Sequence, residues 1–244
     1  MGCGLSEAAY KGRGVSLSVA MTRPKRHRRG NGIEGGRLLP MVFGSLSMPE
    51  RPSHDYQAVQ ATRRAEILAR LEPVLGGRTL LTLEIGCGHG HFLNAYATAH
   101  PDRHCLGIDI MSDRVRRGLR KRDRASLTNL AFLHADAWDL LAVLPAQVRL
   151  EAVFVLFPDP WPKRRHWKNR ILQPAFLTAL AEKSTPASPL YFRTDYEPYF
   201  AEAREVVASH EAWELRPDLP WPFEHTTVFQ ARAPTYHSLI AIRR

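Results

Sequence analysis

The fold is decided by the stretch Thr79-Leu80-Leu81-Thr82-Leu83-Glu84-Ile85-Gly86-Cys87-Gly88-His89-Gly90. Up to Ile85 it is apolar or β-branched apart from one glutamate, which predicts a buried strand, and alternating glycines then predict a tight turn. A helix over His91–Ala99 and a strand over His104–Asp109 follow. Strand, turn, helix and strand in this order form a βαβ unit, so the stretch predicts a parallel sheet covered by helices.

The same alternation extends in both directions. A helix is expected from Ser53 or Asp55 to Gly76, ahead of the first strand. Further helices are expected over about 112–124, after Asp136, and over about 171–182 and 197–208, with strands over about 130–134, 151–157 and 190–194. Two last strand candidates, about 226–231 and 236–242, lie a short loop apart and are expected to pair antiparallel. The predicted fold class is α/β, a doubly wound and mostly parallel seven-stranded sheet with a C-terminal antiparallel hairpin.

Composition limits the classes of protein that fit. The chain has 244 residues, 44% of them hydrophobic, which is enough for one substantial core with tails. No run of about eighteen apolar residues could span a bilayer. The formal net charge of +10 favours a polyanionic partner. Three cysteines at irregular spacing suit free thiols in a reducing compartment, so a cytoplasmic location is expected.

The first part of the chain has a different character. Residues 1–52 hold scattered Gly, Pro, Ser and Arg, with the densest charge at Arg23–Arg29, and no helix or strand period holds there. We expect a disordered basic leader over 1–52 and the folded domain over 53–244. An RNA-binding arm and a translation start at Met41 or Met48 are the alternatives for this segment.

Acidic residues close three successive predicted strands. Glu84 lies near the end of the first, Asp109 ends the second and Asp136 follows the third. The first turn carries three glycines, which let a ligand approach the backbone: Gly86, Gly88 and Gly90. Open α/β sheets bind ligands at this edge. A carboxylate before the turn suits a cationic, amino-bearing ligand such as S-adenosylmethionine. Asp109 is placed to bond the ribose hydroxyls of this ligand, and Asp136 is placed to bond its adenine amino group.

Two other interpretations of this turn are weaker. Nicotinamide dinucleotides bind Gly-x-Gly-x-x-Gly, whereas the spacing here is Gly-x-Gly-x-Gly, and Glu84 would repel a pyrophosphate. A metal site at Cys87, His89 and His91 is disfavoured because alternate residues on a turn rarely converge on one ion. We therefore predict neither a nicotinamide cofactor nor a metal.

A second informative stretch is Phe157-Pro158-Asp159-Pro160-Trp161-Pro162-Lys163-Arg164-Arg165-His166-Trp167-Lys168-Asn169-Arg170, which follows a predicted buried strand. Because proline fixes its own φ and restricts the residue before it, the Asp159 carboxylate is expected to be held stiffly. A rigid acid beside a basic segment suits a site where one base is handled while phosphates are bound.

With these residues in view, the chain resembles the bacterial tRNA (guanine-N7)-methyltransferases from about residue 55 to the C-terminus. The motifs that carry the resemblance are Phe157–Lys163 with His166 and Arg170, Thr194-Asp195 with Tyr199, and Thr227–Gln230. The resemblance implies a Rossmann-like class I methyltransferase fold and methylation of a guanine in the tRNA variable loop. It implies cofactor contacts from Glu84, Asp109 and Asp136, and places Asp159 between cofactor and guanine. Lys163, Asp195 and the segment Thr227–Gln230 would meet the substrate.

Two departures from the family pattern are visible. The ribose position usually carries Glu, and here it is Asp109, one methylene shorter but still a bidentate acceptor. The family segment Thr-x-Phe/Tyr-Glu ends here in Gln230. Another register would use Phe223-Glu224, which lacks the preceding threonine. The missing carboxylate affects the expected guanine or cofactor contact more than the reaction class.

The expected chemistry follows from guanine itself. N7 carries a lone pair and no proton, so its methylation needs positioning and no base at that atom. The purine becomes cationic, and a fixed carboxylate stabilises that charge. We assign this role to Asp159, which would accept from guanine N1–H and the exocyclic amine, with Asp195 as a second acceptor.

The basic segment after Asp159 is expected to hold tRNA phosphates. The predicted RNA-contacting residues are Lys163, Arg164, Arg165, Lys168 and Arg170, with His166 either orienting a phosphate or filling space. Trp161 and Trp167 either stack on a base or pack. The basic helix over 112–124 is expected to be a solvated face, with a secondary RNA contact as the alternative.

The predicted activity is transfer of a methyl group from S-adenosyl-L-methionine to guanine N7 in tRNA. The predicted partner is tRNA, with no membrane and no obligate protein partner. A methyltransferase of the same fold with another RNA or protein substrate is one alternative. A catalytically silent tRNA-binding homologue, suggested by Gln230, is the other.

Overall fold

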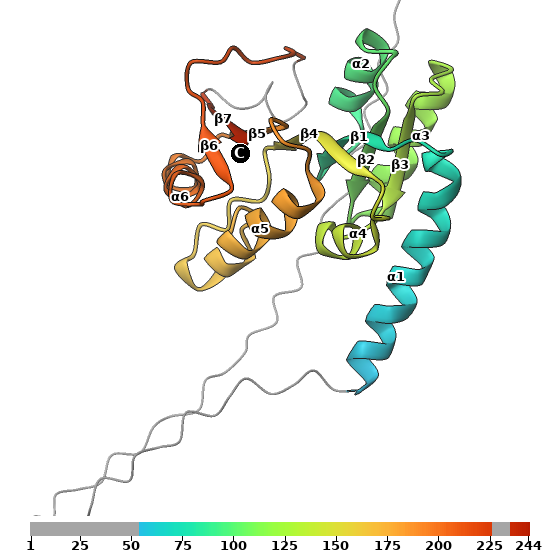
Figure 1. Ribbon diagram of the computed structural model, residues 1–244, viewed down its shortest axis with the longest axis horizontal. Coiled ribbons are helices and arrows are strands. Elements are labelled where there is room, and N and C mark those ends of the chain that lie inside the picture. Colours follow the sequence, from blue (N-terminus) through green and yellow to red (C-terminus); the bar gives the residue numbers. More distant parts are fainter. Residues whose placement is uncertain (1–53, 226–234) are drawn as a thin grey trace, which may run out of the picture. The chain divides into compact units, whose positions relative to one another are not determined.

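The computed structural model describes residues 54–225 and 235–244 (Figure 1). The strands in these ranges are β1 (Leu80–Ile85), β2 (Cys105–Asp109), β3 (Leu130–His134), β4 (Arg149–Leu156), β5 (Pro189–Thr194), β6 (Trp213–Leu215) and β7 (His237–Arg243). The helices are α1 (His54–Leu75), α2 (His91–Ala99), α3 (Ser112–Arg124), α4 (Ala137–Val143), α5 (Pro174–Lys183) and α6 (Glu197–Ala208), with a short 3-10 helix, η1 (Arg164–Asn169).

The strands form one sheet in the order β3-β2-β1-β4-β5-β7-β6. Strands β1 to β5 run parallel, whereas β7 is antiparallel to both β5 and β6. The strand order reverses between β1 and β4, which is where open α/β sheets form their ligand-binding crevice. The predicted fold class is therefore confirmed.

The antiparallel edge differs in one detail from the sequence-based expectation. β7 covers the predicted strand over 236–242, but the partner that the structure shows on its outer side is β6. β6 was not predicted, because Trp213-Glu214-Leu215 is too short to establish a period. The predicted strand over 226–231 lies outside the described residues, as does the leader over 1–52.

Helices cover both faces of the sheet, which explains the nearly continuous apolar strands (Figure 1). One hydrophobic cluster joins the sheet to α1, α4, α5 and α6, with Leu71, Phe176 and Tyr199 fully buried in it. The other lies under α2 and α3 and contains Phe92, Phe132 and Phe154. The two clusters hold the strand ends at fixed positions relative to one another.

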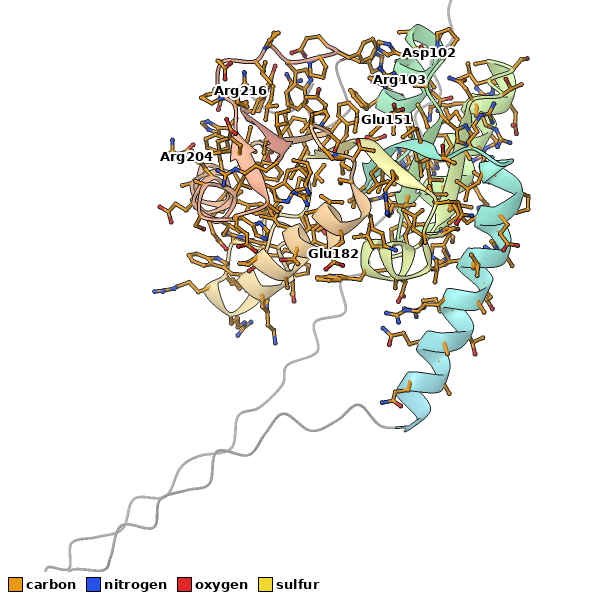
Figure 2. The ribbon with its side chains drawn as sticks, viewed as in Figure 1. Asp102, Arg103, Glu151, Glu182, Arg204 and Arg216 are labelled. Atoms are coloured by element: carbon orange, nitrogen blue, oxygen red, sulfur yellow. The ribbon has the colours of Figure 1, made fainter. Side chains whose placement is uncertain are left out.

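Two ion pairs fix elements that matter for the site. Arg103, just before β2, pairs with Glu151 of β4, and the labelled side chains lie close together in Figure 2. Arg64 of α1 donates from Nε to Asp139 Oδ1 of α4 at 2.9 Å. The first pair links the two strands on either side of β1, and the second holds α1 against α4.

Helix α5 begins at Pro174, not at Ile171 as the apolar pattern predicted. The backbone N–H groups of Ile171 and Leu172 donate to the Tyr199 hydroxyl oxygen at 3.1 and 3.3 Å. These residues therefore extend the loop after η1, and proline takes its favoured place in the first turn of the helix. No helix in the described ranges is long and apolar enough to cross a membrane.

Candidate functional site

The carboxyl end of β1 places an acid in a buried position. Glu84 is 3% exposed and lies in register between Gly107 of β2 and Phe154 of β4. Burial raises the pKa of Glu84 well above its ordinary value, and the nearby Asp109 raises it further. Its Oε2 atom has no hydrogen-bond partner among the described residues. A buried carboxylate oxygen without a donor is suited to a ligand that brings a positive charge or an N–H group.

The carboxylate that ends β2 is fixed by the backbone around it. Asp109 is buried, and its Oδ2 and Oδ1 atoms accept from Gly88 N at 2.9 Å and Met111 N at 2.8 Å. Arg114 Nη1 lies 3.7 Å from Oδ2. A carboxylate has about four acceptor positions, so Asp109 can still accept from ligand hydroxyls while it holds the glycine turn in place.

Two glycines in the turn serve different purposes. Gly88 and Gly90 both have positive φ, 54° and 67°. A Cβ added at Gly88 would meet nothing within 4 Å, whereas one at Gly90 would lie 2.6 Å from Phe132 Cζ. Gly88 therefore borders open space that a ligand can enter, and Gly90 permits close packing of the turn against the core.

A cavity of about 580 Å³ lies beside these strand ends. It is lined by α1, including Thr62 and Glu66, and by Ile110 and Asp136 after β2 and β3. Ile110 is 65% exposed and presents an apolar surface to the cavity. Asp136 caps α4 by accepting from Trp138 N at 2.8 Å. The cavity can hold a flat, partly apolar ring that has polar groups at its edge.

The loop after β4 leaves the sheet with strained backbone. Phe157 and Trp161 have φ values of 50° and 45°, which non-glycine residues adopt at a cost of about 1–3 kcal/mol each. Phe157 N donates to Arg193 O at 2.8 Å. Asp159 lies between them and is exposed. Since Ile85 and Val155 are neighbours in the sheet, this loop and the glycine turn leave adjacent strands at the same edge.

The basic segment that follows is mostly at the surface. Lys163, Arg164, Arg165 and Lys168 are exposed. His166 is half-buried, with its ring 5.7 Å from that of Trp161 in an edge-on arrangement. Its position favours packing beside Trp161. The exposed cations leave a positively charged surface next to Asp159.

Arg170 is an exception, because its burial in the free protein does not fit the predicted RNA contact. Arg170 is 2% exposed and pairs with Glu202 of α6, while its Nε donates to Pro160 O at 2.9 Å. Its guanidinium lies over the rings of Trp167 and Tyr199 at 4.6 and 4.8 Å. Arg170 therefore holds the Asp159 loop against α6, and Trp167 packs beneath it.

The carboxyl end of β5 brings a further acid to the same edge. Thr194 is buried, and its Oγ1 accepts from Tyr196 N at 3.2 Å, whereas Asp195 is exposed. Tyr199 is buried, with its hydroxyl on the backbone before α5, and burial raises its pKa to about 12. Thr227 and Gln230, the other predicted substrate contacts, lie outside the described residues.

One arginine that the sequence analysis missed organises this side of the site. Arg193 is buried and pairs with both carboxylate oxygens of Glu224, at 2.9 and 2.6 Å. Its Nε donates to Ser238 Oγ at 2.9 Å, and its guanidinium lies 3.7 Å from the ring centroid of Trp221 and 4.9 Å from that of Tyr236. A charged residue inside an otherwise apolar strand was the sequence signal that could have identified it.

The sequence analysis also missed that α1 lines the cavity. The sequence predicts the helix, but no motif in it indicates that the helix lies beside the ends of β2 and β3. Its position depends on packing against α4. Among the described residues, no group of three or more His, Cys, Asp or Glu could hold a metal ion.

Comparisons with known proteins support one family. Residues 78–235 match the model of a family described as "Putative methyltransferase". A tRNA (guanine-N(7)-)-methyltransferase of Bordetella pertussis is 31% identical over 214 residues, which cover 84% of this chain and 77% of that protein. One of Nitrosococcus oceani is 36% identical over 128 residues, and this match spans about half of each protein, 52% and 54%.

The solved structures extend the fold assignment. The 16S rRNA methyltransferase KamB is 16% identical, with a TM-score of 0.52, and the match covers 72% of this chain and 93% of that one. At this identity the likeness concerns the fold alone.

Proposed function

The chain belongs to the tRNA (guanine-N7)-methyltransferase family, and from this premise we propose that it transfers the methyl group of S-adenosyl-L-methionine to N7 of a guanine in the variable loop of tRNA. The observation that carries the proposal is the shared edge of β1 and β4. A buried carboxylate with one unpartnered oxygen lies near one strand end, and an exposed, stiffly mounted acid follows the next.

The residues near β1 and β2 fit the cofactor. When bound, S-adenosyl-L-methionine supplies an electrophilic methyl group on a sulfonium, together with an amino group. Glu84 Oε2 offers an unused acceptor for the amino group, and the open space at Gly88 admits the ligand beside the backbone. Asp109 would bond the ribose hydroxyls. A carboxylate whose pKa is raised in the free protein regains stabilisation when a cation binds beside it.

The cavity beside α1 suits the adenine. Asp136 lines it and would accept from the adenine amino group, while Ile110 offers an apolar surface for the ring. Gly86 and Gly90 have positive φ and shape the turn after β1. Ile110 and Asp136 would therefore hold the adenosine end of the cofactor, and Glu84 would hold its amino group.

The Asp159 loop would orient the guanine. N7 needs no base, because it carries a lone pair and no proton. Asp159 would accept hydrogen bonds from guanine N1–H and the exocyclic amine, and would stabilise the positive charge that develops on the purine. Asp195 follows the neighbouring strand β5 and would be the second acceptor on that edge. Thr227 and Gln230 remain proposed substrate contacts.

The exposed cations would hold the RNA. Lys163 lies nearest Asp159 in the chain and is assigned to the substrate nucleotide, and Arg164, Arg165 and Lys168 to neighbouring phosphates. Cytoplasmic location is part of the proposal, supported by the free thiols of Cys87 and Cys105, both buried. The proposal also includes a basic leader over 1–52 ahead of a catalytic domain over 53–244.

The test is methyl transfer from labelled cofactor to an unmodified tRNA transcript, with the product mapped by borohydride and aniline cleavage at N7-methylguanine. We expect cleavage at one guanine of the variable loop. The matched control is the same transcript with that guanine changed to adenine, which should accept no label. Label at another atom, or in a protein, would favour a different substrate. Tight tRNA binding without transfer would favour the catalytically silent alternative suggested by Gln230.

A further inference from the structure

Helix α3 carries an unusual density of positive charge. Its thirteen residues, Ser112–Arg124, include seven Lys or Arg and two Asp. Val115 and Gly118 are buried, and Leu119 packs against the core. The remaining face is therefore cationic along the length of the helix, roughly 20 Å at 1.5 Å per residue.

The acids of α3 neutralise only part of this charge. Asp113 accepts from Arg116 Nη2 at 3.0 Å and from Arg117 Nε at 3.1 Å, and Asp123 pairs with Arg122. Arg120 and Arg124 are exposed and have no acidic partner within residues 54–225 and 235–244. Like charges crowded on one helix repel one another, so a polyanion bound here would relieve a cost already present in the free protein.

This surface is continuous with the cofactor turn. Lys121 Nζ donates to His89 O at 2.8 Å, and a Cβ added at Gly90 would lie 3.0 Å from Gly118 Cα. His89 and His91, on the turn and at the start of α2, have ring centroids 6.3 Å apart. The cationic face of α3 therefore borders the site.

The electrostatics of the histidines agree with this arrangement. Burial lowers the pKa of His89, and the neighbouring Arg117, Lys121 and Arg114 lower it further. The pKa of His91 is lowered by burial and then by Lys121, His89 and His225. Both rings thus lie in the positive potential of α3.

We propose that α3 and the glycine turn form a second phosphate-binding surface for the same tRNA, across the site from Lys163–Lys168. The inference rests on the proposed function. In the sheet, α3 follows β2, and the loop with Lys163 follows β4, so the two surfaces flank the end of β1. The tRNA backbone would then contact cations on both sides of a guanine held at this edge. One surface would bind the phosphates before the guanine, and the other would bind those after it.

The test uses a pair of variants matched in charge. Arg120→Ala/Arg124→Ala removes two exposed cations from α3, and Arg78→Ala/Arg149→Ala removes two from the opposite, amino-terminal edge of the sheet. For the α3 variant, we expect the dependence of log Kd for tRNA on log salt to lose up to about two units of slope. The control variant should keep the slope, and both should bind S-adenosyl-L-methionine as the parent does.

A second measurement follows the histidines directly. Phosphates bound at α3 would raise the pKa values of His89 and His91, and a proton NMR titration with and without tRNA measures this. An unchanged slope in the α3 variant, or an equal loss in the control variant, would overturn the inference. Either outcome leaves the proposed function standing if the parent still methylates tRNA at guanine N7.

Discussion

The two sides of the site differ in how their residues are held. On the side of β1, β2 and β3, each acid comes at or next to a strand end, and backbone N–H groups fix two of them: Gly88 N and Met111 N donate to Asp109, and Trp138 N donates to Asp136. On the side of β4 and β5, the loops are held by two buried arginines. Arg170 pairs with Glu202, 32 residues away, and Arg193 with Glu224, 31 residues away.

The stability of the protein should therefore respond differently to substitutions on the two sides. The side of β1, β2 and β3 depends on the glycines of the turn and on the buried carboxyl group of Glu84. The side of β4 and β5 depends on long-range ion pairs with two buried guanidinium groups, where loss of the acidic partner leaves a buried arginine unpaired. The following predictions test this division.

The largest effect is expected at the glycine turn. Gly90→Ala places a methyl group against Phe132 and Gly118 at positive φ, so it should cost about 1–2 kcal/mol from strain and another ~1–3 from overpacking. Gly88→Ala should show the strain alone, because nothing lies within 4 Å, yet it should lose cofactor affinity. Chemical denaturation and calorimetry measure the two quantities. Equal stability of the two variants would contradict the division of roles.

The next effect concerns the substrate side. Arg170→Met should destabilise the fold by about 3 kcal/mol, at the lower end for a broken buried pair because the Glu202 side chain is 24% exposed and can be hydrated. Lys168→Met, an exposed neighbour, should change the free energy of unfolding by no more than about 0.5 kcal/mol. Thermal unfolding of both variants tests this. A loss confined to tRNA affinity in Arg170→Met would return that residue to the RNA-contacting set.

The smallest expected effect on stability is an increase, and it concerns Glu84. Because the folded-state pKa of Glu84 is raised above its ordinary 4.5, the free protein loses stability as the pH rises from that value through the raised pKa. Glu84→Gln removes this loss, so the variant should be more stable than the parent at pH 8 and should lose the difference near pH 4. It should also bind the cofactor poorly. Denaturant midpoints at both pH values give the comparison, and a variant less stable at pH 8 would contradict it.

The same division explains what the sequence could predict. The helices and strands from α1 to α6 and the order of the three acids follow from local periodicity and turn chemistry. Strand β6 was missed because three residues carry no period. The burial of Arg170 was not predicted, because a charge run does not show which of its members is buried. The partners of Arg170 and Arg193 lie about thirty residues away, beyond the reach of any local pattern.

The central claim is that Asp159 acts on the guanine and not on the fold or the cofactor. Its most direct test is single-turnover methyl transfer to tRNA by Asp159→Asn, with Asp102→Asn, an exposed acid far from the site edge, as the control. We predict a loss of about 10²–10³ in the rate of transfer, with cofactor affinity and unfolding temperature close to those of the parent. Undiminished transfer by Asp159→Asn would contradict the account.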